Sequence, residues 1–156
     1  MKKLILMSGV PGSGKSTWAN KYKIDHKNEN VFIVASDEIR KELGGRYQYF
    51  DEESKVWSLF LSRTNDYAKL YNDVTVIMDA TNLTNHYRLM YLNSTPSFDF
   101  HTLINFNLPL ERVLKQNKMR EDGRVVNEDA MKMLINEYED VSSEVMDSFD
   151  EYIEIK

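Results

Sequence analysis

The alternation of apolar runs with amphipathic stretches is the first feature that the sequence offers. Four short apolar runs, typical of buried strands, lie at residues 4–7, 31–35, 74–78 and 100–106, and residues 152–155 alternate in the manner of a fifth strand. Helical spacing of apolar positions follows or separates these runs, at residues 15–22, 37–43, 51–71, 83–92, 109–119 and 126–138. Repeated strand–helix units with short strands predict an α/β fold, with a parallel sheet covered on both faces.

No repeat, low-complexity tract or flexible linker interrupts this pattern, so we expect residues 1–156 to form a single domain. The opening MKKLILM has too short an apolar stretch for a signal peptide and is interpreted as the first strand. The chain has no cysteine and no run approaching the ~20 apolar residues of a bilayer span. We therefore expect a cytoplasmic protein without a membrane partner.

The charge is unevenly distributed. The net charge is −5, but residues 127–156 hold ten acidic and two basic residues, which leaves the preceding part mildly basic. The overall charge argues against a protein that passively coats nucleic acid. The acidic segment is interpreted as a solvated face.

Residues 9–17 read GVPGSGKST and follow directly after the first apolar run. A Gly-x-x-x-x-Gly-Lys-Ser pattern between a strand and a helix is that of a phosphate-binding loop, whose N–H groups turn toward phosphate oxygens. The start of the following helix adds a positive partial charge. We expect the ATP phosphates to be surrounded by Gly9, Pro11, Gly12, Ser13, Gly14, Lys15, Ser16 and Thr17. Lys15 is predicted to contact the β- and γ-phosphates, and Ser16 to ligate Mg²⁺.

A loop of this kind serves switches, motors and kinases alike. The sequence lacks the Asn-Lys-x-Asp guanine motif of regulatory GTPases, and motors usually have much longer chains. These observations favour a small kinase with the P-loop NTPase fold, a three-layer sandwich whose sheet order is 2-3-1-4-5. A helical lid is expected at about residues 109–127.

The segment SDEIR places Asp37 at the mouth of the second strand and Arg40 three residues later, on the same helical face. A kinase needs a carboxylate that accepts the proton of the attacking hydroxyl, and a cation that holds an anionic acceptor in line. Asp37 and Arg40 fit these roles. The structural alternative is a helix-capping aspartate with a local salt bridge.

Four segments of the chain resemble the kinase domain of bacteriophage polynucleotide 5′-kinases, within the wider group of P-loop kinases that includes the zeta-type toxins. They are MKKLILMSGVPGSGKSTWA, SDEIR, VIMDATNLTNHYR and QNKMREDGR. The resemblance implies transfer of the ATP γ-phosphate to a 5′-hydroxyl end of DNA or RNA. It assigns the general base to Asp37, an acceptor 3′-phosphate contact to Arg40 and a donor-phosphate contact to Arg120. One departure is that Asp79 stands one place earlier, relative to Thr81-Asn82, than in the phage pattern.

Other candidates lie close to the predicted strand ends and the lid. Asp79 is a candidate Mg²⁺ carboxylate; Thr81, Asn82 and Arg88 are candidate acceptor contacts, and Arg124 joins Arg120 as a candidate ATP contact. The structural alternatives are a helix cap for Asp79, a turn role for Thr81 and Asn82, and an exposed basic loop for Arg120 and Arg124. Helical spacing favours core positions for Trp57, Phe60 and Tyr67, whereas the loop aromatics Tyr47, Tyr49 and Phe50 are better candidates for stacking on a base.

The sequence therefore predicts an Mg²⁺- and ATP-dependent kinase that acts on 5′-hydroxyl polynucleotide ends. Two alternatives stay open: a kinase of small molecules, nucleosides or nucleotides, and a non-catalytic nucleotide-binding module. The sequence does not distinguish DNA from RNA. It leaves a homo-oligomer open.

Overall fold

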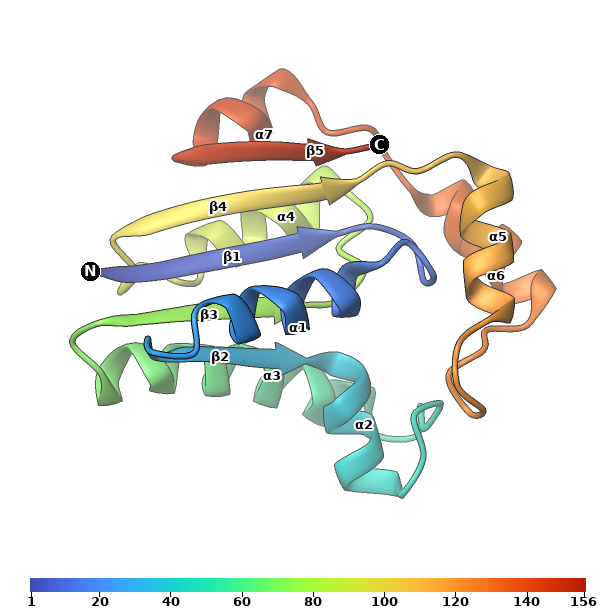
Figure 1. Ribbon diagram of the computed structural model, residues 1–156, viewed down its shortest axis with the longest axis horizontal. Coiled ribbons are helices and arrows are strands. Elements are labelled where there is room, and N and C mark those ends of the chain that lie inside the picture. Colours follow the sequence, from blue (N-terminus) through green and yellow to red (C-terminus); the bar gives the residue numbers. More distant parts are fainter.

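A five-stranded sheet forms the centre of the molecule. The computed structural model describes residues 1–156 and contains the strands β1 (Lys2–Ser8), β2 (Val31–Ala35), β3 (Val74–Asp79), β4 (Phe100–Phe106) and β5 (Glu151–Ile155). Their order is β2-β3-β1-β4-β5, and all neighbouring strands are parallel. The predicted strand order and the α/β fold are confirmed, and all carboxyl ends of the strands point to one edge (Figure 1).

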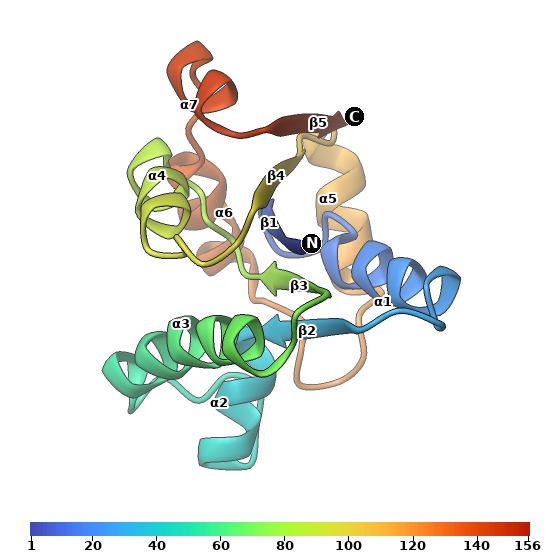
Figure 2. The same ribbon diagram turned by 90° about the vertical axis from the view of Figure 1, so that its left-hand side faces the viewer.

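Helices cover both faces of this sheet, as the continuous apolar runs require. They are α1 (Lys15–Asp25), α2 (Ser36–Gly44), α3 (Glu53–Leu70), α4 (Asn85–Asn93), α5 (Leu110–Lys118), α6 (Glu128–Glu137) and α7 (Ser143–Ser148). Figure 2 shows α1 on one side of the sheet and α3 and α4 on the other. The strand β3 is buried along its whole length because both layers press on it.

The alternation of side chains along each strand divides the core into two halves. Ile5 and Met7 of β1 pack with Ala19 of α1 on one face. Leu4 and Leu6 belong to the larger cluster on the opposite face, with residues of α3, α4 and α7. The period of two between successive side chains is therefore sufficient to assign each residue of β1 to its layer.

Two details differ from the sequence-based expectation. Ser36 and Asp37 do not cap α2: the helix begins at Ser36, Ala35 occupies the N-cap position, and no side chain caps it. The chain passes from β2 into α2 without a turn, so Asp37 lies inside the first helical turn. The short helix α7, capped by Ser142, was not predicted because it has little more than one turn of pattern.

The elements that surround the carboxyl edge of the sheet differ from those that cover its faces. α2, α5 and α6 lie beyond the ends of the strands, and the loop after β1 extends toward α5 before it turns back into α1 (Figure 1). Side chains that follow β1, β2 and β3 therefore meet at one edge, where ligands bind in open α/β sheets. None of the helices combines the length and apolarity that a bilayer span needs.

Candidate active site

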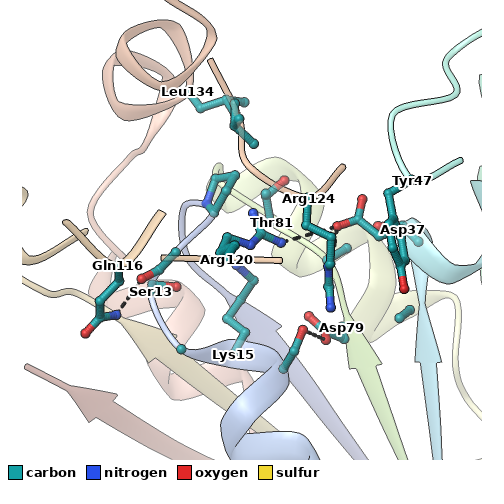
Figure 3. Close-up of a pocket in the computed structure, with 18 of the residues that line it drawn as sticks. Ser13, Lys15, Asp37, Tyr47, Asp79, Thr81, Gln116, Arg120, Arg124 and Leu134 are labelled. Carbon is teal, nitrogen blue, oxygen red and sulfur yellow. Dashed lines mark hydrogen bonds and ion pairs between the residues drawn. The ribbon is translucent and has the colours of Figure 1, made fainter. Parts of the chain in front are cut away.

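A cavity of about 890 Å³ lies at the carboxyl edge of the sheet. Its wall combines the phosphate loop, the first turn of α2, the end of β3 and side chains of residues 109–127, the segment that is predicted to form a lid and is here called the lid. Nearly all the predicted site residues line it, namely Pro11, Gly12, Ser13, Gly14, Lys15, Ser16, Thr17, Asp37, Arg40, Asp79, Thr81, Arg120 and Arg124. Figure 3 shows Lys15, Arg120, Asp37 and Asp79 converging on this space.

The glycines of the phosphate loop are required by its backbone. Gly12 and Gly14 have φ angles of 82° and 93°, in the left-handed region that favours glycine. A Cβ on Gly12 would also lie 2.9 Å from the backbone of α5. A Cβ on Gly9 would lie equally close to Phe106, and the N–H of Gly9 donates to the carbonyl of Thr81 at 2.8 Å. The loop is thus fixed both by its own torsions and by the neighbouring strands.

The helix α5 holds the loop from the lid side through a residue that sequence reasoning missed. Gln116 Nε2 donates a hydrogen bond to the carbonyl of Gly12 at 2.5 Å, and Arg112 Nε donates to Gln116 Oε1 at 3.0 Å. The two residues of the first contact lie 104 positions apart in the chain. No local pattern could indicate a contact of this range.

Lys15 is buried at the base of the cavity. Its ammonium donates to the carbonyl of Val10 at 3.0 Å, so it lies against its own loop. Burial lowers the pKa of Lys15 to about 8, and the nearby carboxylate of Asp79 offsets only part of this effect. A phosphate group would supply the negative charge that the buried ammonium needs as a partner.

Ser16 and Asp79 form the one direct pair that joins the phosphate loop to β3. Ser16 Oγ donates to Asp79 Oδ2 at 2.7 Å. No group of three or more His, Cys, Asp or Glu side chains surrounds them. A hydroxyl and a carboxylate fit Mg²⁺, which takes few protein oxygens and completes its shell with water and phosphate.

Three arginines surround the carboxylate of Asp37. Arg40 Nη1 donates to Oδ1 at 2.9 Å, while Nη2 atoms of Arg120 and Arg124 lie 3.7 and 3.8 Å from Oδ2. The arginines of the lid and the aspartate after β2 therefore meet at the cavity (Figure 3). Burial, and then the neighbouring Arg124, lower the pKa of Arg120. The cavity consequently holds more positive charge than Asp37 alone neutralises.

Arg40 is also fixed from α3, by a residue that the sequence did not single out. Glu53 accepts two hydrogen bonds from Arg40, at 3.0 Å from Nε and 2.7 Å from Nη2. Burial alone would lower the pKa of Arg40, but the carboxylates of Glu53 and Asp37 raise it. Three of the five guanidinium N–H groups are occupied by these carboxylates, which leaves two for another acceptor.

The loop between α2 and α3, residues 45–52, touches the lid across the cavity. Gln48 Nε2 donates to the carbonyl of Val125 at 2.7 Å. The ring of Tyr47 lies between two cations, 4.5 Å from Lys41 Nζ and 4.9 Å from the guanidinium carbon of Arg124. The aromatic and amide contacts thus join the α2–α3 loop to the lid.

Asn82 and Arg88, predicted to contact an acceptor, do not reach the cavity. Arg88 is fully buried, and its guanidinium donates to Ser8 Oγ, to the carbonyls of Asn82 and Leu83, and to Asn85 Oδ1. Asn82 is itself buried, has a φ of 45° and donates to the carbonyl of Met7. Both residues secure the turn after β3 to β1, which corrects the expectation of a ligand contact.

Two curated proteins are similar to this chain in sequence. An L-seryl-tRNA(Sec) kinase of Methanococcus maripaludis is 28% identical over 142 residues, which span 87% of this chain and 52% of the relative. The protein kti12 of Schizosaccharomyces pombe is 28% identical over 151 residues, spanning 88% and 51%. The chain thus covers about half the length of these curated relatives.

A chain in the solved structure of the Pnkp1/Rnl/Hen1 RNA repair complex superimposes with a TM-score of 0.74 and 21% identity, over 96% of this chain and 46% of that chain. Likeness at this identity concerns the fold alone. Residues 4–150, nearly the whole chain, match the family AAA_33, described as an AAA domain. The fold, the phosphate loop and this match agree, and the chain belongs to the AAA_33 family of nucleotide-binding P-loop proteins.

Proposed function

We propose that the protein is an ATP-dependent kinase that transfers the γ-phosphoryl group to the 5′-hydroxyl end of a polynucleotide. The observation that carries the proposal is Asp37, a carboxylate on the wall of the same cavity as the phosphate loop and in contact with lid arginines. A hydroxyl between Asp37 and the γ-phosphate would lie in line for transfer.

The donor half of the cavity provides for a triphosphate. The loop N–H groups and Lys15 would bind its phosphates, and Arg120 and Arg124 would neutralise the charge that spreads over the transferring group. Two buried polar atoms on the cavity wall, Ser13 Oγ and Arg124 Nε, have no hydrogen-bond partner within the chain. Phosphate oxygens would satisfy them. Mg²⁺, held by Ser16 and Asp79, would supply positive charge at the β- and γ-phosphates.

The reaction itself requires one proton transfer. Asp37 would accept the proton of the 5′-hydroxyl while the oxygen forms its bond to the γ-phosphorus. The bond from the γ-phosphorus to the β,γ-bridging oxygen breaks, and ADP leaves. Arg40, with two N–H groups not used by carboxylates, would bind the acceptor's 3′-phosphate.

The relatives support an acceptor that is part of, or attached to, RNA. An RNA repair complex and a kinase named for seryl-tRNA are among the similar proteins. The second of these favours an alternative acceptor, the primary hydroxyl of serine carried on a tRNA. The protein kti12 is also among the similar proteins. A nucleotide-binding role without phosphoryl transfer is the alternative that the experiment must exclude.

The test is an acceptor panel with γ-labelled ATP. It contains 5′-hydroxyl RNA and DNA oligonucleotides, single-stranded and at duplex ends, together with seryl-tRNA, nucleosides and small alcohols. We expect labelled 5′ ends. Label found only on seryl-tRNA would support the alternative, and label on no acceptor despite tight ATP binding would refute a kinase.

The variant Asp37→Asn connects the activity to the cavity. Without a carboxylate to accept the proton, we expect kcat to fall by about 10²–10⁴-fold, while the Kd for ATP changes little. The matched control is Asp66→Asn on the exposed side of α3, outside the cavity, which we expect to retain full activity. Transfer by Asp37→Asn at the wild-type rate would remove Asp37 from the chemistry.

A further inference from the structure

The α2–α3 loop presents three aromatic side chains, and two of them are committed to other contacts. Tyr47 lies between Lys41 and Arg124. Tyr49 donates its hydroxyl proton to Glu52 and packs on Gly44 so closely that a Cβ there would overlap its ring. Phe50 lines the cavity and contacts only one cation, that of Arg40.

Phe50 is 58% exposed although it forms part of the cavity wall. Its ring centroid lies 5.2 Å from the guanidinium carbon of Arg40, and Trp57 lies 5.3 Å from the same carbon. The cation therefore holds an aromatic ring on the wall of the charged cavity, with more than half of the Phe50 surface open to a ligand.

The position of this ring relative to the reacting groups is set by Arg40. The same guanidinium bonds Asp37 at 2.9 Å. One nucleotide carries a 5′-hydroxyl, a 3′-phosphate and a base on a single sugar, and Asp37, Arg40 and Phe50 offer a matching carboxylate, cation and aromatic surface on one wall. We propose that Phe50 stacks on the base of the acceptor's 5′-terminal nucleotide and thereby selects a nucleic acid end over a small alcohol. This inference rests on the proposed function.

The stacking energy sets the expected selectivity. A base on an aromatic side chain contributes about 1–3 kcal/mol, with little dependence on which base it is, which corresponds to roughly 5- to 150-fold in affinity. An alcohol without a base gains none of this. Phe50 thus distinguishes acceptor classes without reading their sequence.

The experiment compares two RNA oligonucleotides that differ only in the first nucleotide, one intact and one abasic. With wild-type protein, we expect the abasic oligonucleotide to have a KM about 5- to 150-fold higher. Phe50→Ala should raise the KM of the intact oligonucleotide to that of the abasic one, with the same kcat and the same KM for ATP. Phe50→Trp should restore the low KM. Tyr87→Ala, which removes an exposed aromatic ring from α4 outside the cavity, is the matched control and should behave as wild type.

Two results would overturn the role of Phe50 while the proposed function stands. One is equal KM of wild type for the intact and abasic oligonucleotides. The other is an equal loss on both oligonucleotides in Phe50→Ala, which would mean that Phe50 only shapes the cavity. A wild-type protein that labels neither oligonucleotide would instead refute the proposed function, and the role of Phe50 with it.

Discussion

ATP affinity should depend on pH through Lys15. Burial lowers the pKa of this ammonium to about 8, and its only hydrogen bond is to the carbonyl of Val10. The phosphates of ATP would favour the charged form, so the nucleotide binds the fraction of molecules in which Lys15 is protonated. Because the group is a base with a lowered pKa, that fraction is high below pH 8 and falls as the pH rises.

The size of the effect follows from the pKa of Lys15, about 8. The protonated fraction is about 0.9 at pH 7 and about 0.1 at pH 9, and the apparent Kd varies as the inverse of the competent fraction. ATP should therefore bind about tenfold more weakly at pH 9 than at pH 7, a difference of ~1.4 kcal/mol. Binding at pH 9 should take up about 0.9 proton per nucleotide.

Two measurements check this prediction. Titration with a fluorescent ATP analogue between pH 7 and pH 9.5 gives the Kd, and calorimetry in buffers of different ionisation enthalpy counts the protons. Lys15→Arg is the control, because its guanidinium stays charged throughout this range. Its Kd should be independent of pH, even if ATP binds more weakly overall. A wild-type Kd that stays constant up to pH 9.5 would refute the reasoning, and an equal slope in Lys15→Arg would assign the titration to another group.

Two further predictions concern stability and the loop. Arg88→Met removes four hydrogen bonds from a fully buried site and leaves Ser8 Oγ without a donor, so it should lower the free energy of unfolding by about 3 kcal/mol in urea. Arg63→Met, which breaks an exposed ion pair with Glu42, should cost under ~1 kcal/mol, and equal losses would contradict the role of Arg88. Gly12→Ala forces a left-handed residue with φ 82° into the backbone of α5 and should weaken ATP binding at least about tenfold. Gly45→Ala has a similar φ of 79° but open space around its Cβ, so the same binding titration should show wild-type ATP affinity.

The fold could be predicted from local features because each of them is decided within a few residues. The apolar runs at residues 4–7 and 74–78 lie inside β1 and β3, which are buried on both faces. The glycines of the phosphate loop are required by torsions that only the loop itself determines. The strand order follows from these two features together, since a phosphate loop after the first strand is typical of this sheet topology.

The roles of the arginines could not be predicted in the same way, because they depend on which groups the folded chain places next to each guanidinium. Arg40 and Arg88 each follow a predicted strand end and each lie on a helix, and the sequence suggested an acceptor phosphate for both. Glu53, 13 positions away from Arg40, holds that guanidinium on the cavity wall. Ser8, 80 positions away from Arg88, accepts a hydrogen bond from the Arg88 guanidinium in the core.

Arg40 and Arg88 differ in the charge of the groups that accept their hydrogen bonds. A guanidinium that is fully buried needs hydrogen-bond acceptors from the protein in place of water. Arg88 donates to neutral oxygens on three segments of the chain. Arg40 pairs instead with two carboxylates that remain about one-third exposed, and its own side chain, although only 9% exposed, lines the cavity. Contacts made only in the folded chain therefore place Arg40 on the cavity wall and Arg88 in the core, where it supports the turn after β3.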